Sequence, residues 1–80
     1  MGWYVYIVRC ADNTLYTGIT TDPKRRMAEH NAGKGAKYTC SRRPVDLVYL
    51  EAAYNRSAAL RREWEIKQLD RTGKFSLILN

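Results

Sequence analysis

The sequence is poor in the residues from which small domains build covalent or metal cross-links. Its 80 residues include two cysteines, Cys10 and Cys40, and a single histidine, His30. A structural zinc site is built from four cysteine or histidine ligands, so these three scattered residues do not supply one. Two unpaired-looking cysteines far apart in the chain fit a reduced, cytoplasmic protein.

The chain also lacks long apolar runs and low-complexity segments. No stretch is long enough to span a membrane, and Met1–Cys10 lacks the basic start and long apolar run of a signal peptide. We find no internal repeat and no linker, which predicts a single domain over residues 1–80. A domain of this size buries only about 60% of its extended-chain surface, so its stability is expected to be marginal.

Positive charge is in excess. Fourteen Lys and Arg residues oppose eight Asp and Glu residues, which gives a net charge of +6 and a pI near 9.6. This balance favours a polyanionic partner, with nucleic acid first and an anionic membrane surface second. The alternative is a basic surface that serves only solubility.

The N-terminal third has the pattern of a β-hairpin. Trp3–Cys10 is dense in β-branched and aromatic residues, which predicts a strand. Ala11–Thr14 has the composition of a turn, and Leu15–Ile19 resumes the strand pattern. We therefore expect two antiparallel strands joined by a short loop.

The remaining segments predict helices around a small sheet. Asp22 followed by Pro23 is a helix start. The other expected elements, in chain order, are a helix that ends near Asn31, a basic loop over Lys34–Pro44, a strand over Val45–Ala52, a helix over Ala58–Asp70, and a short helix over Gly73–Leu79 capped by Thr72. The predicted fold class is α/β (α+β), in the order β-β-α-β-α-α, with helices flanking a three-stranded sheet.

One glutamate of the long helix is out of place. On a helical wheel Glu63 falls near the middle of the apolar arc that contains Ala59 and Ile66. A carboxylate there is costly unless it is paired, hydrogen-bonded or bound to a metal. The pattern leaves two interpretations open: a functional carboxylate, or a partial salt bridge with Lys67 one turn on.

The first helix places Arg26 and His30 on one face, four residues apart. An arginine can hold two phosphate oxygens, and a neighbouring histidine can orient water or transfer a proton. A solvated basic helix would have the same pattern. Tyr4, Tyr6 and Tyr16 lie on the adjacent hairpin strands, where an aromatic residue can also serve only for packing.

The basic loop combines cations with an aromatic residue, a composition suited to a nucleic-acid backbone with a stacked base. A solvated, mobile loop is the alternative. The candidate nucleic-acid-binding residues are Lys34, Lys37, Tyr38, Arg42 and Arg43.

Several of these segments together resemble a known family. Tyr4-Val5-Tyr6 precedes Tyr16-Thr17-Gly18, and a helix with an arginine and a His-Asn ending follows. Leu60–Trp64, which contains Glu63, is similar to the segment that bears the metal-binding glutamate of this family. The chain thus resembles the GIY-YIG nucleases, and in particular the small YhbQ-like single-domain group. Its first tripeptide is YVY instead of GIY, and its second is YTG.

The resemblance implies a GIY-YIG fold with an antiparallel sheet, and a metal-dependent endonuclease that acts in DNA repair or processing. It implies nucleic acid, DNA in particular, as the partner, one Mg²⁺ or Mn²⁺ ion as the cofactor, and no membrane. The implied active-site tyrosines are Tyr6 and Tyr16; Arg26 would steady the scissile phosphate, His30 would assist proton transfer and Glu63 would hold the metal. Which tyrosine accepts a proton from water stays open.

Two other classes of function compete with an enzyme. One is a non-catalytic nucleic-acid-binding module that kept the fold, and the other is an interaction domain for a repair protein. Retention of the full set of candidate catalytic residues, and above all a carboxylate among apolar neighbours, favours the enzyme.

Overall fold

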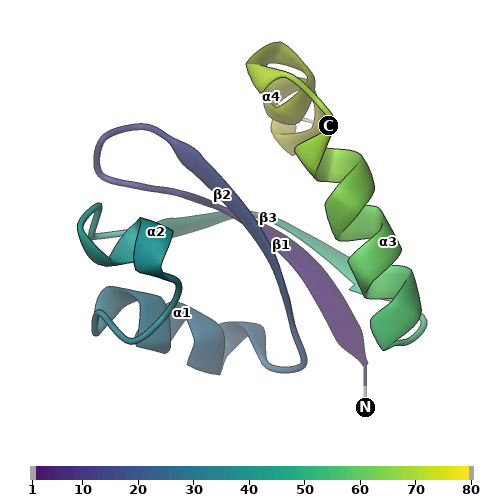
Figure 1. The fold of residues 1–80 in the computed structure, drawn as a ribbon, viewed down its shortest axis with the longest axis horizontal. Helices are drawn as coiled ribbons and strands as arrows, with labels where there is room; N and C mark the ends of the chain where they lie inside the picture. The colour runs from purple at the N-terminus through teal and green to yellow at the C-terminus, as the bar shows by residue number, and fades with distance from the viewer. Residues whose placement is uncertain (1, 80) are drawn as a thin grey trace.

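The computed structural model describes residues 2–79 and contains a three-stranded antiparallel sheet with helices on both sides (Figure 1). Strands β1 (Trp3–Arg9) and β2 (Leu15–Thr20) form the N-terminal hairpin. Strand β3 (Asp46–Ala53) pairs with the other edge of β1, so the order is β2-β1-β3. The predicted fold class is confirmed, and β1 is its central strand.

Side-chain alternation along β1 produces two cores, one on each face of the sheet. Val5 and Ile7 point to one face, where they pack with residues of the C-terminal helices. Tyr6 and Val8 point to the other face, together with Cys10. Because successive residues of one strand serve both cores, the seven residues of β1 connect the two halves of the domain.

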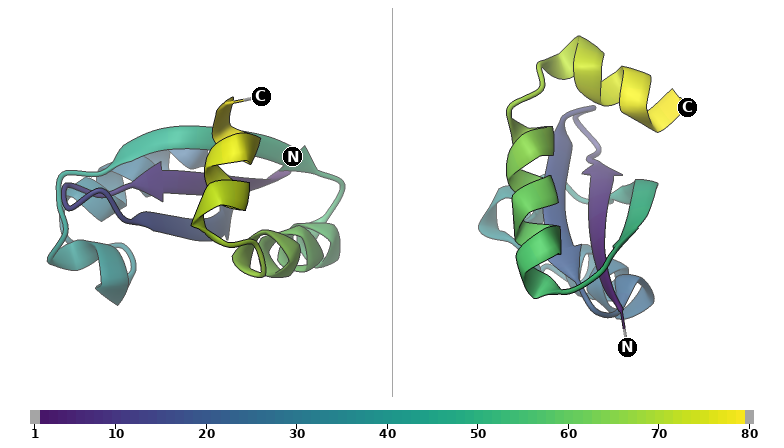
Figure 2. Two further views of the ribbon diagram at one scale, coloured as in Figure 1. Left: turned by 90° about the horizontal axis from the view of Figure 1, so that it is seen from above. Right: turned by 90° about the vertical axis from the view of Figure 1, so that its right-hand side faces the viewer.

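The helices lie in two groups on either side of the sheet (Figure 1). Figure 2 shows that α2 and α3 flank the edge strand β2 on the same side of the molecule. No helix within residues 2–79 has the length and apolar character needed to cross a bilayer. The helices are α1 (Pro23–Asn31), α2 (Lys37–Cys40), α3 (Arg56–Lys67) and α4 (Arg71–Leu79).

Side-chain caps fix the starts of α1 and α3. Asp22 accepts a hydrogen bond from the backbone N–H of Arg25 at 3.1 Å, and a proline opens the first turn of α1. This start was predicted and is confirmed. Asn55 caps α3 by accepting from the N–H of Ala58 at 2.8 Å, so α3 begins at Arg56, two residues before the prediction.

Two local predictions were wrong. The basic segment predicted as a loop contains the short helix α2, which is a single turn and therefore too short to produce a periodic pattern. The last helix does not use Thr72 as its cap. Asp70 accepts from the N–H of Gly73 at 2.8 Å, so α4 starts at Arg71.

The apolar arc of α3 is packed over only part of its width. Ala59 and Ile66 are fully buried, whereas Leu60 and Trp64 are among the exposed large apolar side chains. The helix lies mainly against β1 and β2, so the rest of the arc extends past the sheet edge.

Candidate active site

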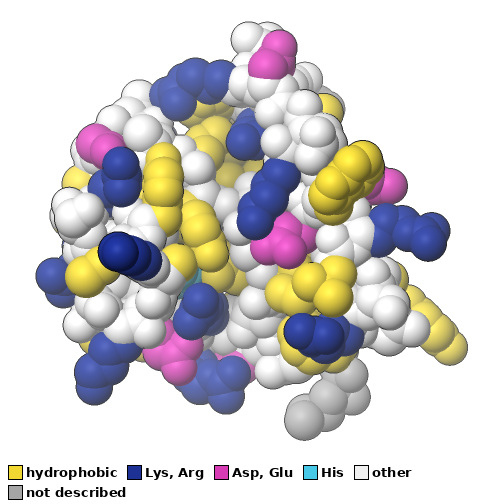
Figure 3. Space-filling view, in the orientation of Figure 1, with side chains coloured by type: hydrophobic (Ala, Val, Ile, Leu, Met, Phe, Trp, Pro, Cys, Tyr) yellow, Lys and Arg dark blue, Asp and Glu magenta, His cyan; other side chains and the backbone are white. Residues whose placement is uncertain are grey.

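The face between α2 and α3 is hollowed, and lysine and arginine side chains gather around the hollow (Figure 3). The sequence predicted that Tyr6, Arg26 and His30 act together. They come from β1 and α1, and hydrogen bonds join them in the structure. Tyr16, from β2, packs beside them with its ring centroid 5.6 Å from that of His30 and 6.5 Å from that of Tyr6.

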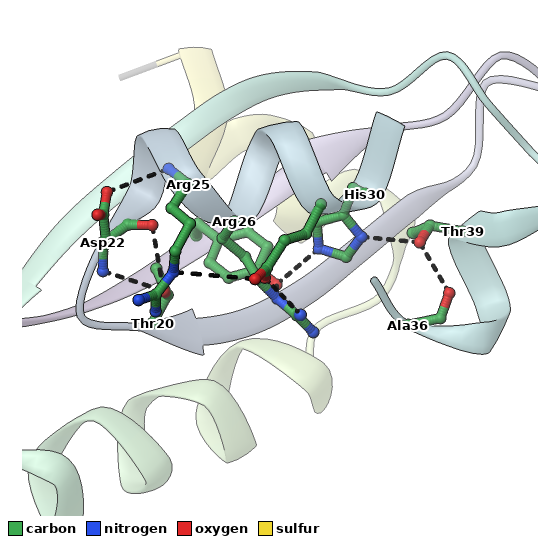
Figure 4. Close-up of polar contacts among 9 residues, drawn as sticks. Thr20, Asp22, Arg25, Arg26, His30, Ala36 and Thr39 are labelled. Carbon is green, nitrogen blue, oxygen red and sulfur yellow. Dashed lines mark hydrogen bonds and ion pairs between the residues drawn. The ribbon is translucent and has the colours of Figure 1, made fainter. Parts of the chain in front are cut away.

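The hydroxyl of Tyr6 is held between an imidazole and a guanidinium. Its oxygen lies 2.9 Å from Nε2 of His30, and Nε of Arg26 donates to it at 3.3 Å. Both the tyrosine and the histidine are fully buried. The arginine also pairs with Glu29 at 3.2 Å, which orients its guanidinium (Figure 4).

Thr39 of α2 fixes the tautomer of His30. Its hydroxyl lies 2.8 Å from Nδ1 of His30 and donates to the carbonyl of Ala36 at 2.9 Å (Figure 4). Because a hydroxyl has one hydrogen to donate, the threonine oxygen accepts from Nδ1–H. The Nε2 atom of a neutral His30 then accepts from the Tyr6 hydroxyl.

Sequence reasoning did not identify Thr39. A buried threonine within a basic stretch leaves no pattern in the sequence, and its partner lies nine residues away across a helix end. Thr39 selects the tautomer of His30 and holds the orientation of its ring, as hydrogen-bonding partners of histidine often do.

The surroundings keep both groups neutral near pH 7. Burial lowers the pKa of His30, and the positive charge of Arg26 lowers it further. Burial raises the pKa of Tyr6, an effect that the hydrogen bond and charge of Arg26 oppose only in part. The ground state is therefore a phenol that donates to a neutral imidazole.

Stability is expected to fall as the pH drops through the range in which histidine titrates. The pKa of His30 is about 6.5 when unfolded and lower when folded, so the unfolded state binds more protons below about pH 7. The free energy of unfolding must then decrease as the pH falls. Urea denaturation between pH 7.5 and 5 measures this slope. The variant His30→Gln should show a flatter profile, and equal slopes would contradict the assignment.

Gly18 makes room for the Tyr6 side chain. It is the cross-strand partner of Tyr6, and a Cβ atom there would lie 2.5 Å from the tyrosine hydroxyl oxygen. We expect Gly18→Ala to destabilise the fold by about 1–3 kcal/mol through overpacking, seen as a lower Tm. Gly2→Ala is the matched control, because its Cβ would meet only atoms 3.9 Å away or farther. Equal melting of the two variants would refute this role.

Glu63 lies on α3 and is partly buried. Its side chain is 19% exposed, and Nζ of Lys67 lies 3.3 Å from its carboxylate. Its negative charge is near enough to contribute to the raised pKa of Tyr6. The structure therefore forms the ion pair with Lys67 that the sequence left open, and the functional interpretation of Glu63 stays a prediction.

The surroundings of Glu63 fit a single hard cation. Within residues 2–79, no three His, Cys, Asp or Glu side chains are grouped as a multi-ligand metal site. Mg²⁺ is often held by one or two carboxylates, with waters and substrate phosphates completing its shell. A single, partly buried carboxylate fits such an ion and does not fit a zinc centre.

Tyr38 extends the aromatic surface outward from the buried tyrosine. Its ring stacks on that of Tyr16, with centroids 5.8 Å apart and an interplanar angle of 25°. The guanidinium of Arg42 lies 4.1 Å from the Tyr38 ring centroid and is paired with Asp12 at 3.0 Å. Arg42 therefore also ties α2 to the hairpin turn.

The other predicted nucleic-acid-binding residues occupy different environments. Arg43 donates to the carbonyls of Cys40 and Asn31, so it holds the chain after α2 in place. Lys34 and Lys37 are exposed, and within the described part of the chain neither forms an ion pair. Two lysines are thus available to an anion, while the two arginines have structural partners.

Comparison with known proteins agrees with this fold. The profile of the family described as "GIY-YIG catalytic domain" matches residues 2–76. The chain therefore belongs to the GIY-YIG family, which is a family of nucleases. Its relatives include the UPF0213 proteins, which form the small single-domain group within it, so the resemblance to the YhbQ-like group is confirmed.

Two relatives illustrate the similarity. The UPF0213 protein SH2523 of Staphylococcus haemolyticus is 60% identical over 75 residues, which cover 94% of this chain and 92% of the relative. The solution NMR structure of the UPF0213 protein BH0048 from Bacillus halodurans has a TM-score of 0.62 and 47% identity, covering 98% of this chain and 83% of that one.

Proposed function

We propose that this protein is a divalent-metal-dependent endonuclease that hydrolyses phosphodiester bonds of nucleic acid, DNA in particular. The observation that carries the proposal is the Tyr6 hydroxyl, which donates to a neutral, buried His30 and accepts from Arg26. A buried phenol joined to an acceptor imidazole and a cation is suited to moving a proton beside an anionic substrate. Membership of a nuclease family supports the reaction class.

The residues would divide the chemistry as follows. Tyr6 accepts a proton from the attacking water while its own proton passes to Nε2 of His30. The water oxygen forms the new bond to phosphorus, and the bond to the leaving oxygen breaks. Arg26, which is hydrogen-bonded to Tyr6, stabilises the phosphate charge. Glu63 would hold Mg²⁺ or Mn²⁺, which when bound stabilises charge on the leaving oxygen.

This geometry favours Tyr6 over Tyr16 as the residue that accepts the proton from water. Tyr6 is hydrogen-bonded to the histidine, whereas Tyr16 meets the imidazole through an edge-on ring contact. We assign Tyr16 to lining the site. A small basic domain contacts mainly phosphates, so we propose weak sequence selectivity, in cytoplasmic DNA repair or processing and with a repair protein as a candidate partner.

Cleavage of labelled single-stranded, duplex and flap DNA, and of RNA, tests the proposal. We expect products with Mg²⁺ or Mn²⁺ and none with EDTA. Absence of products from every substrate with either metal would refute an enzyme. Salt-dependent binding without products would instead identify a nucleic-acid-binding module.

A further inference from the structure

Helix α4 brings two cations to a pocket beside the candidate active site. The pocket has a volume of about 200 Å³ and is built from three segments that are far apart in the sequence: the hairpin turn, α2 and α4. Its lining residues are Thr14, Leu15, Tyr38, Arg71 and Lys74. Of these, only Tyr38 was a candidate from sequence, so the pocket adds α4 to the functional surface.

Neither cation of the pocket is neutralised by a carboxylate within residues 2–79. Nη2 of Arg71 donates to the backbone carbonyl of Asn13 at 2.9 Å, and its guanidinium lies 4.8 Å from the Phe75 ring centroid. These contacts orient the arginine without cancelling its charge. Lys74 is half-buried and lines the pocket next to Arg71. Two such cations favour an anion.

The opposite wall is suited to a nucleobase. The ring of Tyr38 is held in place by Tyr16 and Arg42, yet 39% of the residue remains exposed. Leu15 adds an apolar surface next to it. Because Tyr16 and Arg42 engage the faces of the Tyr38 ring, a base would pack edge-on against its exposed rim. Adjacent Lys and Arg side chains can bind the phosphate of the same nucleotide.

We propose that this pocket binds one nucleotide of the substrate strand, with its phosphate between Arg71 and Lys74 and its base against Tyr38. The proposal rests on the proposed function, because the pocket joins the active site through the Tyr38–Tyr16 stack. The ring centroids of Tyr38 and Tyr16 are 5.8 Å apart, and those of Tyr16 and Tyr6 are 6.5 Å apart. At roughly 3.4 Å of axis per phosphate on one strand, the bound nucleotide lies a few positions from the cut.

Binding can be measured separately from cleavage. Fluorescence anisotropy of a labelled oligonucleotide in EDTA, over a series of salt concentrations, reports affinity without turnover. We expect Lys74→Gln to weaken binding several-fold and to lower the salt dependence by about one phosphate contact. Tyr38→Ala should weaken binding by on the order of tenfold. Lys74→Arg, which keeps the charge, should restore affinity.

Arg61→Gln is the matched control, because Arg61 is an exposed arginine of α3 outside this pocket. It removes the same charge and should leave affinity close to wild type. If the wild type cleaves DNA but Lys74→Gln binds and cleaves as well as Arg61→Gln, the pocket is refuted and the nuclease stands. If the wild type never cleaves, yet Lys74→Gln binds more weakly than Arg61→Gln, the nuclease fails and the pocket stands. An absence of oligonucleotide binding by the wild type overturns both.

Discussion

Tyr6→Phe is expected to slow cleavage by about 10²–10⁴-fold, the range attributed to a positioned proton-transfer group. The substitution keeps the ring that packs between β1 and α1 but removes the hydroxyl that links Nε2 of His30 to Arg26. Leaving a buried imidazole nitrogen without its donor should also lower stability by about 1–3 kcal/mol. Single-turnover rates at saturating enzyme separate the chemical step from binding, and thermal unfolding confirms that the variant is folded.

Tyr4→Phe is the control for this experiment. Tyr4 lies on the same face of β1, one alternation away, and is bonded to neither His30 nor Arg26. Its loss of a hydroxyl should leave the rate near that of the wild type. If the two phenylalanine variants cut equally fast, Tyr6 would have no part in proton transfer.

Glu63→Gln is expected to remove most metal-dependent cleavage. The amide keeps the size of the side chain but loses the charge that would hold a divalent cation. Metal stabilisation of the transition state is worth several kcal/mol, so we expect a loss of about 10²–10³-fold or more. The lost ion pair with Lys67, which is 49% exposed, should affect stability little. Initial rates across a range of Mg²⁺ and Mn²⁺ concentrations measure the effect.

Glu65→Gln provides the comparison on the same helix. Glu65 is exposed and pairs with Arg62 at 3.3 Å. It should behave as wild type at every metal concentration. A Glu63→Gln variant with the metal dependence and rate of Glu65→Gln would exclude Glu63 as the metal ligand.

Local chemistry accounts for the parts of the fold that were predicted. Alternation along Trp3–Arg9 assigned residues to the two faces of β1, because the side-chain period of a strand is two. The capping side chains of Asp22 and Asn55 mark helix starts through bonds made within three residues. The same logic failed at α2, since one helical turn has no period, and at α4, where Asp70 and Thr72 are both competent caps.

The candidate site likewise combines relations that local sequence predicts with contacts that it does not. The helical wheel singled out Glu63, and helical spacing placed Arg26 and His30 together, because these relations depend only on residues a turn or two apart. The pairing of His30 with Tyr6 spans 24 residues, and its pairing with Thr39 joins two helices. Such contacts depend on strand register and helix docking.

By itself the sequence therefore determined the hairpin, the start of the first helix, the basic character, and the positions of Glu63, Arg26 and His30 on their helices, all of which follow from local periodicity and side-chain chemistry. The full set of candidate catalytic side chains came from the resemblance to the family. Only the tertiary structure decided which of those side chains are hydrogen-bonded to one another. The sheet register that places Tyr6 over Gly18 brings its hydroxyl to His30 and Arg26. The docking of α2 supplies Thr39, and that of α4 supplies Arg71 and Lys74. These contacts form only when segments distant in the chain pack against one another, so no local pattern encodes them.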